Sequence, residues 1–148
     1  MLARGLVNVR SQFGPEETVN RLEAELAAKG MTVFARVDHA AGAEAVGLAL
    51  QPTEVLIFGN ARGGTPLMQA ARTIGLDLPI RTLVWQDAAH VTWLTYNDPR
   101  WLARRHVLGP EAEDAVAAMT LMVKTLAAAA TGTSVAKTVR RASKKSAR

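Results

Sequence analysis

The chain has 148 residues, a formal net charge of +5 and no cysteine, and this length fits one domain with a single core. Hydrophobic residues make up 49% of the sequence and charged residues 21%, a globular composition that excludes a wholly disordered chain. The lack of cysteine excludes disulfides, cysteine nucleophiles and cysteine-ligated zinc or iron–sulfur centres. The first residues lack the apolar core of a signal peptide, and Lys124 interrupts the richest apolar run before it reaches a membrane-spanning length. We therefore expect a cytoplasmic protein that is not inserted in a membrane.

The positive charge is concentrated at the C-terminal end. Residues 131–148 hold six of the 18 basic residues and no acidic one, which leaves 12 basic against 13 acidic residues in residues 1–130. We predict one domain over residues 1–130 and a basic, disordered tail over residues 131–148, because the tail has few large apolar groups. The tail fits weak, non-specific binding to nucleic acid or to acidic partners, or a purely solubilising role.

The first half of the chain is predicted to alternate strands and helices. Pro15 follows Gly14 in a pattern typical of a helix start, and Val19, Leu22 and Leu26 recur on one helical face. Alternating apolar residues predict a half-buried strand, and four consecutive apolar residues predict a central strand. The predicted elements are strands at residues 6–9, 31–37 and 55–58 and helices at residues 15–29 and 40–46.

The second half begins with a predicted helix and ends with another. Thr65 and Pro66 are typical of a helix cap followed by proline at the first helical position. Two runs rich in Val, Thr and Trp are separated by three residues, which favours an antiparallel hairpin. The predicted elements are helices at residues 67–74, 99–105 and 110–130 and strands at residues 80–86 and 90–96.

The element order β-α-β-α-β-α-β-β-α-α predicts the fold class. A hairpin late in the sheet and two terminal helices argue against a doubly wound parallel sheet. We predict a two-layer α+β domain with a mixed or mostly antiparallel sheet of about five strands and helices mainly on one face. Phe34, Trp85, Trp93 and Tyr96 are expected on the uncovered face. Such a face favours a homodimer.

A glycine-rich segment between a strand and a helix is the first candidate site. It runs from Phe58 through Asn60 and Gly64 to Thr65 and Met68. Backbone N–H groups at such a junction suit an anion or a carbonyl oxygen. The segment has neither the Walker A nor the G-x-G-x-x-G spacing, so it does not support nucleotide binding by those devices. The structural alternative is that the glycines serve the turn and Thr65 caps the helix.

The neighbouring residues Asp38 and His39 are the second candidate site. Adjacent strand residues point to opposite faces, so they share a pocket only where the strand has ended. If Asp38 caps the following helix, His39 can turn toward the glycine-rich segment as a base or a ligand; the alternative is a structural histidine. His90 and His106 are expected to be exposed, and no pair of histidines has helical metal-site spacing, so we predict no metal site.

Several short motifs together resemble a known family. They are Asp38-His39, Gly47-Leu48, Pro52-Thr53, Phe58-Gly59-Asn60, Gly64-Thr65-Pro66-Leu67-Met68, Asp77-Leu78-Pro79 and Tyr96. Over about residues 5–128 the sequence resembles the family called domain of unknown function 302. The resemblance implies a compact α+β domain, commonly homodimeric, in bacterial and archaeal proteins and without an established activity. Because both candidate sites belong to one motif set, we expect them to converge in space.

Three functional hypotheses follow. The first is a cytoplasmic homodimer that binds a small ligand through Phe58, Asn60, Gly64, Thr65 and Met68, with His39 as a further contact. The second is an enzyme in which His39 acts as acid, base or ligand and Asp38 orients it. The third is a dimeric scaffold whose basic tail binds nucleic acid or acidic partners. The sequence identifies neither a ligand nor a cofactor.

Overall fold

The computed structural model describes residues 3–135, and within them the strands and α-helices follow the predicted order. The strands are β1 (Leu6–Arg10), β2 (Thr32–Asp38), β3 (Thr53–Gly59), β4 (Ile80–Gln86) and β5 (Thr92–Asn97). The α-helices are α1 (Pro15–Ala28), α2 (His39–Ala45), α3 (Ala61–Ala70), α4 (Pro99–Arg105) and α5 (Glu113–Thr131). Two short 3-10 helices, η1 (Arg72–Leu76) and η2 (Pro110–Ala112), precede β4 and α5.

The five strands form one open sheet in the order β1-β5-β4-β3-β2, and every neighbouring pair is antiparallel. The predicted α+β class is confirmed. The β4–β5 turn is stabilised by Asp87, whose Oδ1 accepts hydrogen bonds from the backbone N–H groups of Ala89 and Val91, both at 2.9 Å. In this turn His90 has a φ of 60°, a left-handed conformation that is uncommon for residues other than glycine.

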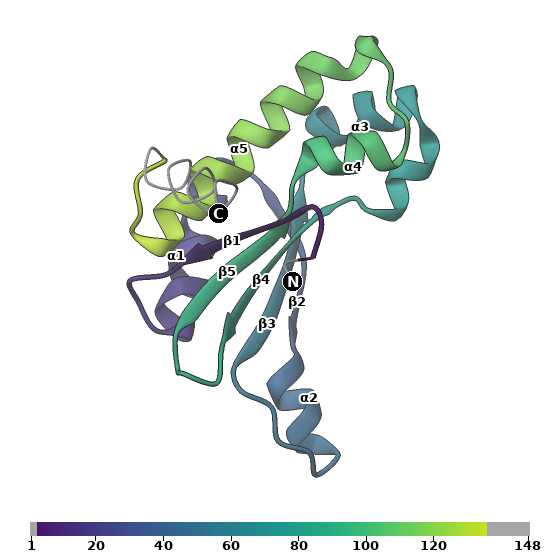
Figure 1. The fold of residues 1–148 in the computed structure, drawn as a ribbon. Coiled ribbons are helices and arrows are strands. Elements are labelled where there is room, and N and C mark those ends of the chain that lie inside the picture. The colour runs from purple at the N-terminus through teal and green to yellow at the C-terminus, as the bar shows by residue number, and fades with distance from the viewer. Residues whose placement is uncertain (1–2, 136–148) are drawn as a thin grey trace, which may run out of the picture.

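Helices α1 and α5 lie on the same face of the sheet, as Figure 1 shows, and enclose the core against it. Helix α1 contributes the predicted stripe of Val19, Leu22 and Leu26, all fully buried. The segment Pro110–Thr131 is long and apolar enough to cross a membrane by length and composition alone. Its Val123 and Leu126 are almost completely buried in the core. The buried side of this helix is part of the core, whereas Leu121 on another side is 62% exposed.

The opposite face of the sheet carries a tryptophan pair. Trp85 and Trp93 lie across from each other on β4 and β5, with ring centroids 6.4 Å apart. The Trp85 indole donates to Thr95 Oγ1 at 2.8 Å, and the Trp93 indole donates to Asp87 Oδ2 at 2.9 Å. Tyr96 was expected on this face but lies in the core, only 5% exposed. It pairs with Val7 and Thr82, and its side chain has the opposite strand parity to Trp93.

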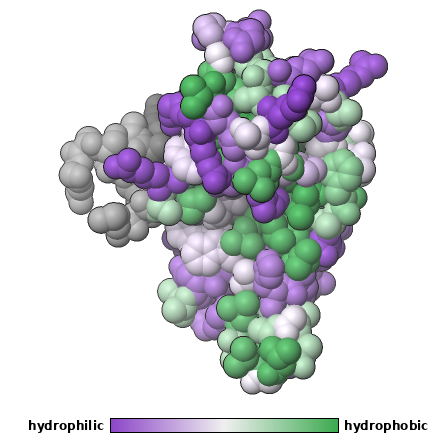
Figure 2. All heavy atoms as spheres, turned by 90° about the vertical axis from the view of Figure 1, so that its right-hand side faces the viewer, coloured by the Kyte–Doolittle hydropathy of each residue, from purple (hydrophilic) through white to green (hydrophobic). Residues whose placement is uncertain are grey.

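Helix α2 projects beyond one end of the sheet, at the bottom of Figure 1. No residue of α2 is buried. The connection from α2 to β3 exposes three large apolar side chains, Val46 (72%), Leu48 (67%) and Leu50 (50%). Apolar side chains also gather over this projecting end in Figure 2. We call His39–Ala45 and residues 46–50 together the α2 arm.

The C-terminal end of α5 is marked by a glycine. The helix ends at Thr131, and Gly132 follows in the left-handed conformation with a φ of 72°. A Cβ on Gly132 would lie 2.8 Å from the Phe13 ring, so glycine is required there by both conformation and space. The predicted disorder of the tail concerns residues 131–148, of which 136–148 lie outside the described residues.

Candidate functional site

The glycine-rich segment forms the first turn of α3. The helix begins at Ala61 because Asn60 is its N-cap: the backbone is extended, and Asn60 Oδ1 accepts a hydrogen bond from the Gly63 N–H at 2.7 Å. The prediction that Thr65 caps the helix and that Gly63 and Gly64 form a loop is therefore wrong. Pro66 stands inside the helix rather than at its first position. The asparagine cap comes earlier than the Thr-Pro signal and determines the start.

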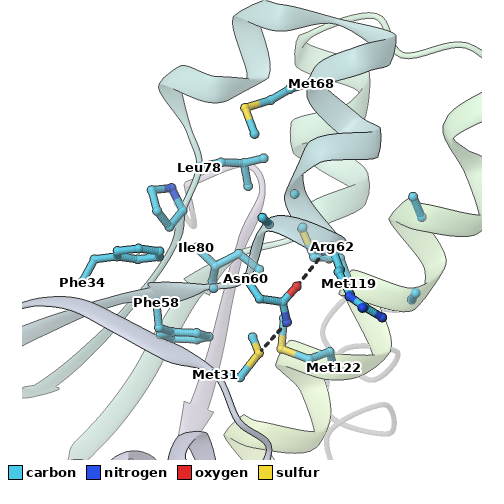
Figure 3. Close-up of a pocket in the computed structure, with 17 residues that line it drawn as sticks. Met31, Phe34, Phe58, Asn60, Arg62, Met68, Leu78, Ile80, Met119 and Met122 are labelled. Atoms are coloured by element: carbon cyan, nitrogen blue, oxygen red, sulfur yellow. Dashed lines mark hydrogen bonds between the residues drawn. The ribbon is translucent and has the colours of Figure 1, made fainter.

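A cavity of about 510 Å³ lies beside this turn. It opens between the ends of β2 and β3, the start of α3, the 78–80 segment and one side of α5 (Figure 3). Its volume is in the range of pockets that take small organic ligands. The lining residues are Met31, Phe34, Phe58, Gly59, Asn60, Ala61, Arg62, Gly63, Gly64, Met68, Leu78, Pro79, Ile80, Ala115, Ala118, Met119 and Met122.

Methionine is the most distinctive residue type in this lining. The chain has five methionines, and the four beyond Met1 all line the cavity: Met31, Met68, Met119 and Met122. The Asn60 amide donates a hydrogen bond to Met31 Sδ at 3.1 Å, so the cap residue also fixes one of these side chains. Flexible, polarisable methionines adapt to varied apolar partners. Only Met68 was predicted as a site residue. The spacing of Met119 and Met122 on one helical face was the available signal for the other two on α5.

Small residues keep the cavity open. A Cβ on Gly64 would lie 3.8 Å from both Leu78 Cδ1 and Met68 Cε, which is ordinary contact distance and places any larger side chain among the lining groups. Ala115 and Ala118 line the cavity from α5. Phe34 borders it from the side of β2 and is 59% exposed. A bulge between Val33 and Ala35 interrupts the strand at this point.

The electrostatics of the lining are simple. Arg62 is its one charged residue, and no carboxylate is among the lining side chains. The Arg62 side chain is exposed and extends from the start of α3 toward α5 (Figure 3). Within residues 3–135, Arg62 has no ion pair or side-chain hydrogen bond. Arg36, in contrast, contacts both Glu23 and Glu54, and those carboxylates hold the pKa of its guanidinium above the ordinary value.

Of the predicted site residues, Phe58, Asn60, Gly64 and Met68 come together in the cavity. Thr65 is exposed and is not among the lining residues.

Asp38 and His39 lie far from the other candidates. Asp38 pairs with Glu54 near the start of β3, whereas Thr32, at the other end of β2, pairs with Gly59. In Figure 1 α2 and α3 accordingly lie at opposite ends of the sheet. The expectation that the two sites converge is therefore wrong within one chain, because the antiparallel register separates them. Asp38 caps α2 and accepts from the Ala41 N–H at 2.9 Å; His39 is exposed on the first turn.

A polar cluster around Asp77 adjoins Leu78 and Pro79, which line the cavity. The Asp77 carboxylate is 8% exposed. Its Oδ1 and Oδ2 accept hydrogen bonds from Arg105 Nη1 at 3.1 and 3.0 Å. Its Oδ2 also lies 2.5 Å from His106 Nε2. His106 Nδ1 lies 2.9 Å from Thr73 Oγ1. The expected exposure of His106 is wrong, since its side chain is only 7% exposed. The cluster ties η1 to α4 and so fixes the 78–79 segment that lines the cavity.

Metal-ligating side chains do not gather anywhere in the described part of the chain: no group of three or more His, Asp or Glu residues there is placed to hold an ion.

Comparison with known proteins adds a family and a fold. The family model described as "Domain of unknown function DUF302" matches residues 7–126. The crystal structure of an uncharacterized conserved DUF302 protein from Bacillus stearothermophilus superposes with a TM-score of 0.75 at 21% identity. The match covers 84% of this chain and 97% of that one. At this identity the likeness concerns the fold.

Curated relatives share higher identity over part of their length. Proteins named fluoride-specific ion channel FluC 1 from Brucella suis biovar 1 and from Brucella abortus biovar 1 are each 56% identical over 115 residues. A FluC 2 protein from Brucella melitensis biotype 1 is equally similar. The match covers 78% of this chain but 45% of the first relative and 43% of the other two. The chain thus spans less than half the length of these relatives.

Proposed function

The chain belongs to the DUF302 family of domains of unknown function, and from the cavity at its motif residues we propose that it binds a small, predominantly apolar molecule. One observation carries the proposal: four separate parts of the chain contribute apolar side chains to one cavity of about 510 Å³. Phe58, Asn60, Gly64 and Met68, which carry the family resemblance, lie in its wall. Apolar walls with a few polar groups are typical of small-molecule sites.

The four methionines and the glycines support the same proposal. Methionine side chains adjust their shape to a guest at low cost, and an Ala or Gly at the wall leaves room where a larger residue would fill the space. The cavity is open to solvent beside the exposed residues Phe34 and Ala118, so its apolar walls contact water unless a molecule covers them. We therefore expect the site to be occupied by a ligand during its function.

A neutral apolar fluorophore tests this function. N-phenyl-1-naphthylamine is expected to bind the purified protein with an increase in emission. Ala118 and Ala117 are both exposed on α5, but only Ala118 lines the cavity. We expect Ala118→Phe to block the fluorophore and Ala117→Phe to leave its binding unchanged. Equal binding to both variants, with both folded by circular dichroism, would contradict the assignment of the site.

We further propose that two copies of the chain associate through the open sheet face and the α2 arm. The face carries the Trp85–Trp93 pair, and the arm exposes Val46, Leu48 and Leu50 away from the core. Exposed apolar groups on a projecting segment are typical of an interaction surface. A second copy of the chain presents the same sheet face and the same α2 arm. A two-fold symmetric dimer would bury these surfaces on both copies. Both contributions count toward the roughly 1,200 Å² of buried surface that a stable interface needs.

The association is tested by light scattering on a sizing column. The double change Val46→Asp and Leu48→Asp is expected to give monomers. Leu76→Asp is the matched control, because Leu76 is equally exposed, at 73%, but lies on η1. A wild-type monomer at micromolar concentration would contradict the proposal. The cytoplasmic location expected from the sequence stays a prediction.

The names of the curated relatives favour a second candidate, a role beside a fluoride channel. The supporting observation is 56% identity over 115 residues with proteins named fluoride-specific ion channels. The chain would then act as an accessory domain on such a channel. The test is fluoride efflux from liposomes that contain a FluC channel, with and without the purified chain. An unchanged efflux rate and no binding to the liposomes would exclude this role.

A further inference from the structure

We propose that the ligand of the cavity is an amphipathic acid, with an apolar body among the methionines and a carboxylate at Arg62. The inference rests on the proposed function and adds the chemical class of the ligand. Its first basis is charge: Arg62 is the one charged lining residue, and no lining carboxylate neutralises it.

The second basis is that Arg62 pairs with no carboxylate of the protein; among the described arginines without a salt bridge, it is the one that lines the cavity. Within residues 3–135 the salt bridges include Arg36 with Glu23 and Arg105 with Asp77, but none to Arg62. Arginine binds carboxylates through two parallel N–H donors. An arginine at a cavity mouth without a protein carboxylate is free to bind one from a ligand.

The third basis is the local backbone. Arg62 is the second residue of α3, a helix of 10 residues. It therefore lies at the positive end of the helix dipole. Asn60 Oδ1 is already occupied by the Gly63 N–H, and its amide donates to Met31. Arg62 and the N-terminus of α3 make the α3 side of the cavity positive, while Phe34 and Phe58 lie on the apolar side opposite (Figure 3). This asymmetry fits a molecule with one anionic and one apolar end.

Three probes that share a ten-carbon chain but differ in head group test the proposal: decanoate, 1-decanol and decyltrimethylammonium, each below its micelle concentration or solubility limit. Isothermal titration calorimetry gives their affinities without relying on the fluorophore. We expect decanoate to bind about tenfold tighter than decanol, the effect of one charge-assisted contact, and decyltrimethylammonium to bind weakest. The preference for decanoate should fall as salt is raised, because the contact lies at the exposed mouth.

The variants Arg62→Gln and Arg104→Gln form a matched pair. Arg104 is exposed on α4 and does not line the cavity. Arg62→Gln is expected to bring decanoate to the affinity of decanol and to leave decanol unchanged, while Arg104→Gln behaves as wild type. Arg62→Lys should restore part of the preference, because it restores the charge without the planar fork.

The outcomes separate this proposal from the one on which it rests. Equal binding of decanoate and decanol to the wild type, or undiminished decanoate binding to Arg62→Gln, overturns the anionic ligand and leaves the apolar site in place. Failure of all three probes and of the fluorophore overturns both. Soluble dihexanoyl phosphatidate is the control for a lipid headgroup. If it binds tighter than decanoate through Arg62, the free acid is wrong and a lipid phosphate takes its place.

Discussion

His106 Nε2 lies 2.5 Å from Oδ2 of Asp77, and both side chains are less than one-tenth exposed. The pair joins the end of η1 to the end of α4 across 29 positions of sequence. Two residues further on, Pro79 lines the cavity. The contact between Asp77 and His106 therefore positions part of the apolar wall of the cavity.

Asp77→Ala is expected to destabilise the protein by about 1–3 kcal/mol, because it leaves the buried His106 ring and the Arg105 guanidinium without their acceptor. Urea unfolding measures the loss. The His106→Ala change and the double variant complete a cycle in which the double loss should be smaller than the sum of the single losses. Additive losses would show that the two side chains do not act together.

Asn60→Ala is expected to lower stability by about 1 kcal/mol, since it removes the N-cap of α3. Asn60→Asp is the matched change: it keeps the acceptor for the Gly63 N–H and loses the donor to Met31. Its melting temperature should stay near that of the wild type. It should also weaken decanoate binding, because it brings a negative charge to the cavity. A melting temperature as low as that of the alanine variant would contradict the cap assignment.

Tyr96 is expected to make stability depend on alkaline pH. Burial raises the pKa of its phenol from 10.0 to about 12, so the folded state holds the proton more tightly than the unfolded state. The contribution is complete below pH 10 and is lost as the pH rises toward 12, about 2–3 kcal/mol in total. Urea unfolding at pH 9 and pH 11 measures the part that is lost by pH 11, about half of the total, and Tyr96→Phe is the control. An equal decline in both proteins would assign the effect to other groups.

Asp87 is expected to make the stability of the protein depend on acidic pH. The hydrogen bond from the Trp93 indole, followed by that from the Val91 backbone, holds the pKa of its carboxyl below the ordinary value. A lowered folded pKa gives a contribution that is present above about pH 4 and is lost as the pH falls through the folded pKa. Tryptophan fluorescence during acid titration follows the contact, and the transition should be absent in Asp87→Asn. An identical transition in that variant would assign the signal elsewhere.

Much of the fold was predictable because it follows from local patterns. The spacing of apolar residues in α1 and α5, together with Gly and Pro residues at the ends of helices and strands, predicted the element order. Strand parity alone could have corrected one error. Trp93 and Tyr96 are three positions apart in one strand and point to opposite faces, so they could not both lie on the open one.

The site was predictable only in part because it depends on distant segments. The N-cap at Asn60 is a local signal, but the Thr-Pro pattern at residues 65–66 is the stronger signal and led to a helix start that was predicted too late. The distance of His39 from the cavity follows from the β2–β3 register, which the sequence of one strand does not contain. Met31 precedes β2, whereas Met119 and Met122 belong to α5, and only packing brings these distant parts of the chain to one cavity.

The β2–β3 hairpin has a mechanical consequence. It bears the α2 arm at one end and, at the other, Phe58 and Asn60 at the cavity wall. Strands of seven residues are stiff over roughly 23 Å, at about 3.3 Å per residue. We therefore expect a partner that binds the α2 arm and displaces these strands to shift the cavity wall as well. In the proposed dimer, ligand binding to one cavity is then expected to change the affinity of the other cavity, which would give a binding curve that is not a simple hyperbola.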